Sequence, residues 1–168
     1  MKTLKIIFFL ILSLFSGNLF AQSVAGHVSI SGFPSKSVIK ESTVVDLFKS
    51  FKEGSYKINF SYKADKVNRR GVVLFDMKTT VVLNGKTIHK SSRGGWPWLP
   101  GDMYVPIEAF DMIPGLQKAG VTPIGKLSPK EMDMALAIGN YDITLEMVPS
   151  SQSVKGEIKP LVFSFSVK

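Results

Sequence analysis

The chain has 168 residues, no cysteine and a formal net charge of +8 at pH 7. Without cysteine it can form neither a disulfide nor a thiolate zinc site, and it has no thiol nucleophile. Packing must therefore hold the fold, and the positive charge favours anionic partners.

The first 21 residues predict a secretory signal peptide. Lys2 and Lys5 precede an almost unbroken apolar run over residues 6–15, and Ala21 is the small residue expected at a cleavage point. The apolar run is shorter than the about 20 residues that span a bilayer, so we expect no transmembrane span in the mature chain, residues 22–168. An exported chain of this size without disulfides is typical of bacterial envelope proteins. We therefore expect a periplasmic or secreted protein that folds as one domain.

Three segments in the first part of the mature chain predict secondary structure. Residues 25–32 alternate weakly in polarity and predict a strand. The apolar positions of residues 44–51 fit the helical period and the strand period only in part, and we interpret this segment as helical or irregular. Residues 56–63 have an aromatic or aliphatic side chain at every second position, which predicts a half-buried strand.

The strongest local signal of the mature chain lies in residues 72–90. This long β-rich run is interrupted by Asn84-Gly85. Asn-Gly accepts positive φ at both central positions of a type I′ turn. The sequence therefore predicts a hairpin of Thr79–Leu83 with Lys86–Lys90.

Residues 93–104 combine both tryptophans of the chain with proline and glycine. We predict that Gly94-Gly95 lets the chain leave the hairpin sharply and that Pro97 stiffens the backbone between the two rings. Rigid aromatic side chains suit a sugar-stacking platform or a protein hot spot. The alternatives are a structural plug at the open end of a sandwich, or one ring inward and one outward. The candidate ligand-binding residues are Arg93, Trp96, Trp98 and Tyr104.

Two later segments predict short helices in connections between strands. The first is residues 107–118, although Pro114-Gly115 interrupts it. The second begins at Ser128-Pro129, where the serine, the proline and Glu131 form a capping box, and it ends before Gly139.

The last about 30 residues predict two strands. Apolar side chains occupy every second position from Tyr141 to Met147, and again from Leu161 to Val167. A Gly-x-Tyr strand followed by a final apolar strand is similar to the closing pair of immunoglobulin-like sandwiches. The resemblance implies a fold class and no activity, and without a Cys…Trp…Cys pattern a true antibody-type domain is excluded.

The whole pattern predicts an all-β fold with one or two short helices in connections, arranged as an antiparallel, immunoglobulin-like β-sandwich. The alternative is a small β-barrel, which would need more evenly spaced turns than residues 95–139 provide.

Basic residues are concentrated in the first part of the mature chain. Residues 22–100 hold thirteen Lys and Arg against five Asp and Glu, whereas residues 101–168 hold six against eight. Such a surface favours an anionic polysaccharide, anionic lipid head groups or an acidic protein, and export argues against nucleic acid. A purely solubilising role of basic side chains on strands is the simpler alternative.

No residue pattern predicts a catalytic site, a metal site or a cofactor. Histidine occurs only at positions 27 and 89, and there is no Gly-x-Ser-x-Gly elbow. We therefore expect a non-enzymatic binding or structural module of the bacterial envelope, with an anionic glycan or another protein as partner. Two alternatives stay open: a polysaccharide hydrolase that uses Asp102, Glu108 or Asp111, and a copper carrier that uses methionine and histidine.

Overall fold

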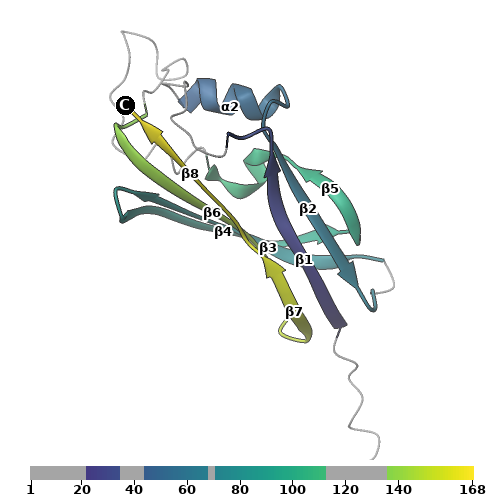
Figure 1. Cartoon of the computed structure of the whole chain (residues 1–168). Coiled ribbons are helices and arrows are strands. Elements are labelled where there is room, and N and C mark those ends of the chain that lie inside the picture. Colours follow the sequence, from purple (N-terminus) through teal and green to yellow (C-terminus); the bar gives the residue numbers. More distant parts are fainter. Residues whose placement is uncertain (1–21, 35–43, 68–70, 113–135) are drawn as a thin grey trace, which may run out of the picture.

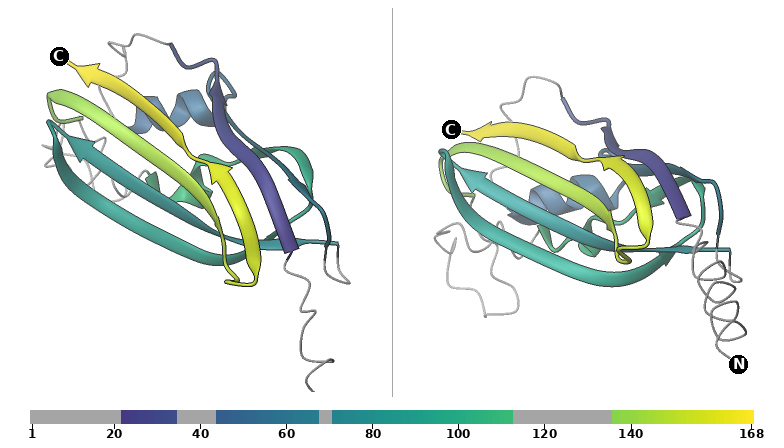
Figure 2. Two further views of the ribbon diagram at one scale, coloured as in Figure 1. Left: turned by 60° about the horizontal axis from the view of Figure 1, so that its bottom comes forward. Right: turned by 90° about the horizontal axis from the view of Figure 1, so that it is seen from below.

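The structure, a computed structural model, describes residues 22–34, 44–67, 71–112 and 136–168. These residues form two β-sheets that pack against each other, with a helix at one end (Figure 1, Figure 2). The all-β sandwich that the sequence predicts is therefore confirmed. The predicted signal peptide and the helix predicted to begin at Ser128 lie outside the described residues.

The first sheet contains the N-terminal strand of the described chain. It consists of β1 (Gln22–Ser31), β2 (Lys57–Ala64), β5 (Gly101–Val105) and β7 (Val154–Lys159). Its order is β5-β2-β1-β7. β2 pairs antiparallel with both β1 and β5, whereas β7 pairs with β1 in parallel.

The second sheet contains the predicted hairpin. It consists of β3 (Val73–Leu83), β4 (Lys86–Trp98), β6 (Gly139–Pro149) and β8 (Leu161–Val167). Its order is β4-β3-β6-β8, and its pairings are antiparallel. Between β3 and β4, Asn84 and Gly85 have φ of 50° and 78°, as the predicted type I′ turn requires.

The strand order is that of an immunoglobulin-like sandwich. β1, β2 and β5 correspond to strands A, B and E, and β4, β3, β6 and β8 correspond to C′, C, F and G. Tyr141 at the start of β6 donates a hydrogen bond from its hydroxyl to the Ala137 carbonyl oxygen at 2.9 Å, which is the tyrosine corner of these folds. The described strands form two open sheets and no closed barrel, so the barrel alternative is wrong.

β7 is the strand that departs from a purely antiparallel arrangement among the described residues. β7 runs parallel to β1 in the first sheet, and β8 lies beside β6 in the second. Pro160 separates them, so the chain changes sheets at a residue that has no N–H to place in a ladder. β7 is not among the strands predicted from sequence, because Gly156 takes the place of an apolar side chain between Val154 and Ile158, and Ile158 is the one buried residue of the strand.

Alternate side chains of both sheets form the core, as the periods of β2 and β6 predict. Phe60 stacks on Tyr62 with ring centroids 4.9 Å apart, and Phe75 meets Phe60 edge to face at 5.2 Å. The buried residues of β2 and β6 are Ile58, Phe60, Tyr62, Tyr141, Ile143, Leu145 and Met147.

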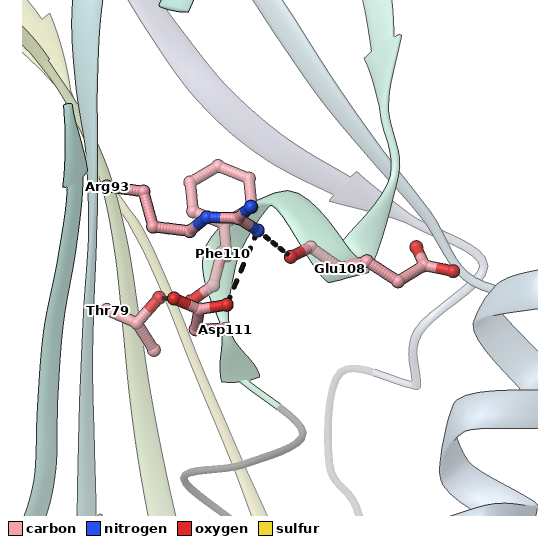
Figure 3. Close-up of polar contacts among 5 residues, drawn as sticks. All are labelled: Thr79, Arg93, Glu108, Phe110 and Asp111. Carbon is pink, nitrogen blue, oxygen red and sulfur yellow. Dashed lines mark hydrogen bonds and ion pairs between the residues drawn. The ribbon is translucent and has the colours of Figure 1, made fainter. Parts of the chain in front are cut away.

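Helix α2 (Val44–Lys52) and the 3-10 helix η1 (Ile107–Phe110) lie at one end of the sandwich (Figure 1). Leu47 of α2 is fully buried, and the helical interpretation of its segment is confirmed. The longer helix predicted to begin at Ile107 starts as a single 3-10 turn, and its residues after Met112 lie outside the described ones. The hydroxyl of the buried Thr79 of β3 donates a hydrogen bond to the Phe110 carbonyl oxygen (Figure 3), and this bond connects η1 to the second sheet.

Candidate binding surface

β4 does not end where the sequence predicts. The prediction that the chain leaves the hairpin at Gly94-Gly95 is wrong, because β4 continues to Trp98 and stays paired with β3. A β-bulge between Phe75 and Met77 accommodates the glycines, and the Asp76 carboxylate accepts a hydrogen bond from the Gly95 N–H at 3.1 Å. Both tryptophans therefore belong to a strand rather than to a loop.

Arg93 connects β4 to η1. Its Nη1 donates to the Glu108 carbonyl oxygen at 2.8 Å and lies 3.4 Å from Oδ1 of Asp111 (Figure 3). Its guanidinium carbon lies 5.3 Å from the centre of the Trp96 ring, within the range of a cation–π contact. Arg93 therefore has a structural role as an anchor of η1, and its Nη1 is engaged by acceptors of the protein itself.

The two tryptophans differ in their surroundings. Trp98 is half-buried and meets Phe60 edge to face with ring centroids 6.0 Å apart. Its carbonyl oxygen accepts a hydrogen bond from the Tyr62 hydroxyl at 2.7 Å. Trp96 remains 43% exposed beside Arg93. Trp96 pairs with the buried Phe75 and Trp98 with the buried Val73, so both side chains lie on the inner side of the sheet. The alternative with one ring inward and one outward is therefore wrong, and the two rings differ only in how far they are exposed at the edge strand β4.

Tyr104 lies on the other sheet and faces outward. It pairs with Asn59 in the register of β2 and β5, opposite the side on which Ile58 and Phe60 are buried. Its side chain is 69% exposed, and the Lys57 ammonium lies 5.5 Å from the centre of its ring. The four predicted ligand-binding residues thus do not converge. Arg93 and Trp96 form one pair, Trp98 lies against the core, and Tyr104 projects from the outer face of the first sheet.

Two grooves meet at Tyr104. The first, which we call the lysine groove, has a volume of about 430 Å³ and lies between the end of α2, the start of β2 and the segment from β5 into η1. The second, which we call the polar groove, has a volume of about 370 Å³ and lies over β1, β2 and β5. Lys52, Lys57, Tyr104 and Glu108 line the lysine groove. Volumes of this size are within the range of small-molecule sites.

Two rows of side chains cross the polar groove. The strand registers place His27, Ser61 and Asp102 in one row and Ser29, Asn59 and Tyr104 in the next. These rows offer hydroxyl, amide, imidazole and carboxylate groups on one face. Asp102 and Tyr104 are candidates from sequence alone, whereas Ser29, Asn59 and Ser61 are not, because the register that aligns these residues joins strands distant in sequence.

The outer face of the first sheet is basic on balance. Outward positions of β2 and β7 carry lysines, and the register places Lys159 beside His27. The exposed charged residues of this face are Lys57, Lys63, Lys155 and Lys159 against Asp102 and Glu157. The positive first part of the sequence thus contributes Lys57 and Lys63 to the same face as Tyr104.

The three carboxylates considered for a hydrolase have different surroundings. Asp102 lines the polar groove, Asp111 faces Arg93, and the Glu108 carboxylate is directed away from Arg93 (Figure 3). In the row His27–Ser61–Asp102 the serine lies between the other two, whereas a hydrolytic triad needs histidine in that place. This arrangement gives hydrolysis no support.

Metal ligands do not gather in the described part of the chain. No group of three or more His, Asp or Glu residues there is placed to hold a metal ion. Met77, Met112 and Met147 are buried in the core, where they fill space between apolar side chains. Met132 and Met134 lie outside the described residues.

No protein-family model matches the chain, and a search of curated proteins finds no significant match. Within the described residues, no helix is both long enough and apolar enough to cross a bilayer.

Proposed function

We propose that the protein is an exported, non-enzymatic module that binds an anionic polysaccharide on the outer face of the sheet β5-β2-β1-β7. The observation that carries this proposal is Tyr104, an aromatic side chain that is 69% exposed between two grooves. An exposed aromatic ring of this size on a sheet face is a common anchor of binding surfaces.

The groups around Tyr104 suit a sugar. The apolar face of a sugar ring can lie on the tyrosine ring, and sugar hydroxyls can exchange hydrogen bonds with Asn59, Ser61 and His27. These polar groups lie on paired strands rather than on loops, so they are already held in place before the ligand binds. Binding then costs little ordering of the protein.

The lysines favour an anionic polysaccharide over a neutral one. Lys57 lies against Tyr104, and Lys63 and Lys159 extend the positive charge along the same face. Neither of the two ion pairs found among the described residues includes these lysines. Their ammonium groups are therefore available to a carboxylate or sulfate of the ligand.

The proposal is tested by affinity electrophoresis of the processed protein in gels that contain hyaluronan, polygalacturonate or uncharged dextran. We expect at least one acidic polysaccharide to retard the protein and dextran to leave its mobility unchanged. Tyr104→Ala should weaken binding by about tenfold or more, because truncation of a central aromatic contact commonly costs more than about 1.4 kcal/mol.

The matched control is Val162→Ala. Val162 is 61% exposed, but on the outer face of the second sheet, so its truncation should leave binding unchanged. The proposal fails if neither acidic polysaccharide retards the protein, or if Tyr104→Ala is retarded as strongly as the unaltered protein.

A further inference from the structure

The two grooves that meet at Tyr104 differ in charge. The lysine groove is lined by two ammonium groups, from Lys52 and Lys57, and by one carboxylate, from Glu108. The polar groove has no lysine or arginine among its lining residues, and its one carboxylate is Asp102. Opposite signs of charge therefore lie on the two sides of one aromatic ring.

The lysines of the first groove come from separate elements. Lys52 ends α2, and Lys57 begins β2. Their neighbour Lys49 already pairs with Glu53 at 3.7 Å, whereas Lys52 and Lys57 belong to neither of the two ion pairs in the described part of the chain. The rest of the groove is largely apolar, with Phe51 and Ile58 among its lining residues. An acidic group carried by a ring with an apolar face would match both properties.

The polar groove disfavours a second acidic group. A carboxylate of the ligand would lie beside the Asp102 carboxylate, whereas Lys63 and Lys159 lie outside the groove, beyond Ser61 and His27 respectively. A sugar with hydroxyl or acetamido substituents can instead donate to Asp102 and Asn59 and accept from Ser61. The unit in this groove is therefore expected to be neutral.

We infer that the protein recognises a polysaccharide in which acidic and neutral sugars alternate, with the acidic unit in the lysine groove, the neutral unit in the polar groove and Tyr104 between them. This inference rests on the proposed function and specifies the class of glycan. It also fixes the register of the bound chain, because a shift by one sugar would place the neutral unit in the lysine groove and the acidic unit in the polar groove.

The test compares oligosaccharides of equal length by calorimetry at low ionic strength. Hyaluronan oligosaccharides alternate acidic and neutral units, whereas every unit of oligogalacturonate is acidic. We expect hyaluronan oligosaccharides to bind about three- to fivefold more tightly, which is the effect of one solvent-exposed charge contact. Because salt screens contacts between exposed charges, the difference in affinity between the two oligosaccharides should decrease as salt is added.

Three charge variants assign the grooves. Lys52→Gln should weaken binding of the hyaluronan oligosaccharides about threefold, and Glu108→Gln should strengthen it by a similar factor. Asp102→Asn should strengthen binding of oligogalacturonate and so reduce the difference in affinity between the two kinds of oligosaccharide. All three side chains are exposed, so these variants are expected to fold like the unaltered protein.

The inference and the proposed function fail in different ways. Equal affinity for both oligosaccharides, or a preference for oligogalacturonate, together with loss of binding in Tyr104→Ala, would overturn the inference and leave the proposed function in place. Absence of binding to either acidic ligand would overturn both.

Discussion

Gly156 lies where β7 runs beside β1, and a side chain does not fit there. Its φ is 107°, and a Cβ atom would lie 1.9 Å from the Val24 carbonyl oxygen. Gly85, in the hairpin turn, also has a positive φ of 78°, but a Cβ atom there would meet nothing within 4 Å. The two positions therefore separate the cost of an unfavourable backbone conformation from the cost of a steric clash.

We predict that Gly85→Ala lowers the free energy of unfolding by about 1–2 kcal/mol, the cost of placing alanine in the left-handed region. Gly156→Ala should lower it by about 3 kcal/mol or more, because β7 must also move away from β1. Urea denaturation followed by tryptophan fluorescence measures both losses. Equal losses would contradict the close approach of the two strands.

Helix α2 depends on the contacts of one face. It has nine residues, which is too short for a stable isolated helix. Leu47 and Phe51 are buried against the core, whereas the Lys49 side chain is 66% exposed. The helix is therefore held by packing, and its last residue, Lys52, reaches the lysine groove because of that packing.

Leu47→Ala should lower the free energy of unfolding by about 2–5 kcal/mol, as expected when a buried leucine leaves a cavity. Lys49→Ala, in the same helix, should change it by less than about 0.5 kcal/mol, because the ion pair with Glu53 is exposed. Circular dichroism during urea denaturation compares the two. A loss for Leu47→Ala as small as that for Lys49→Ala would mean that α2 does not pack on the core.

The elements predicted correctly from sequence are those whose own residues carry the signal, without dependence on a distant pairing partner. The residues Asn84-Gly85 themselves favour the turn that they form. The alternation of apolar and polar residues from Tyr141 to Met147 likewise indicates a half-buried strand without reference to any other segment. The face on which Tyr104 lies depends on its pairing with Asn59, which is distant in sequence. The continuation of β4 past Gly94-Gly95 likewise depends on a bulge opposite Asp76, which composition does not predict.

Across the whole molecule, each sheet carries a buried tyrosine whose hydroxyl donates to a backbone carbonyl: Tyr62 in the first sheet and Tyr141 in the second. Burial raises the pKa of Tyr62 to about 12 and raises the pKa of Tyr141 above its ordinary value of 10, because the charged phenolate loses its hydration there. The folded protein therefore keeps both phenols protonated at a pH where the unfolded chain ionises them.

The stability that these tyrosines contribute is complete below pH 10 and is lost as the pH rises from 10 through about 12. We predict that the Tm falls across this interval and that the fall is smaller in Tyr62→Phe, which has no phenol to ionise. Thermal denaturation at a series of pH values, with tyrosinate absorbance recorded in parallel, provides the measurement. An unchanged Tm up to pH 12, or the same fall in the variant, would contradict the prediction.

The parallel alignment of β1 and β7 also has a mechanical consequence. The start of β1 and the C-terminus lie at opposite ends of the sandwich (Figure 1), and the chain runs from β7 through β8 to that C-terminus. A stretching force applied to the two ends would load the β1–β7 ladder in shear, so that the hydrogen bonds joining Gln22–His27 to Val154–Lys159 would bear the load together. Bonds loaded in this way must rupture as a group, and the domain is therefore expected to resist extension more strongly than one whose terminal strands unzip bond by bond.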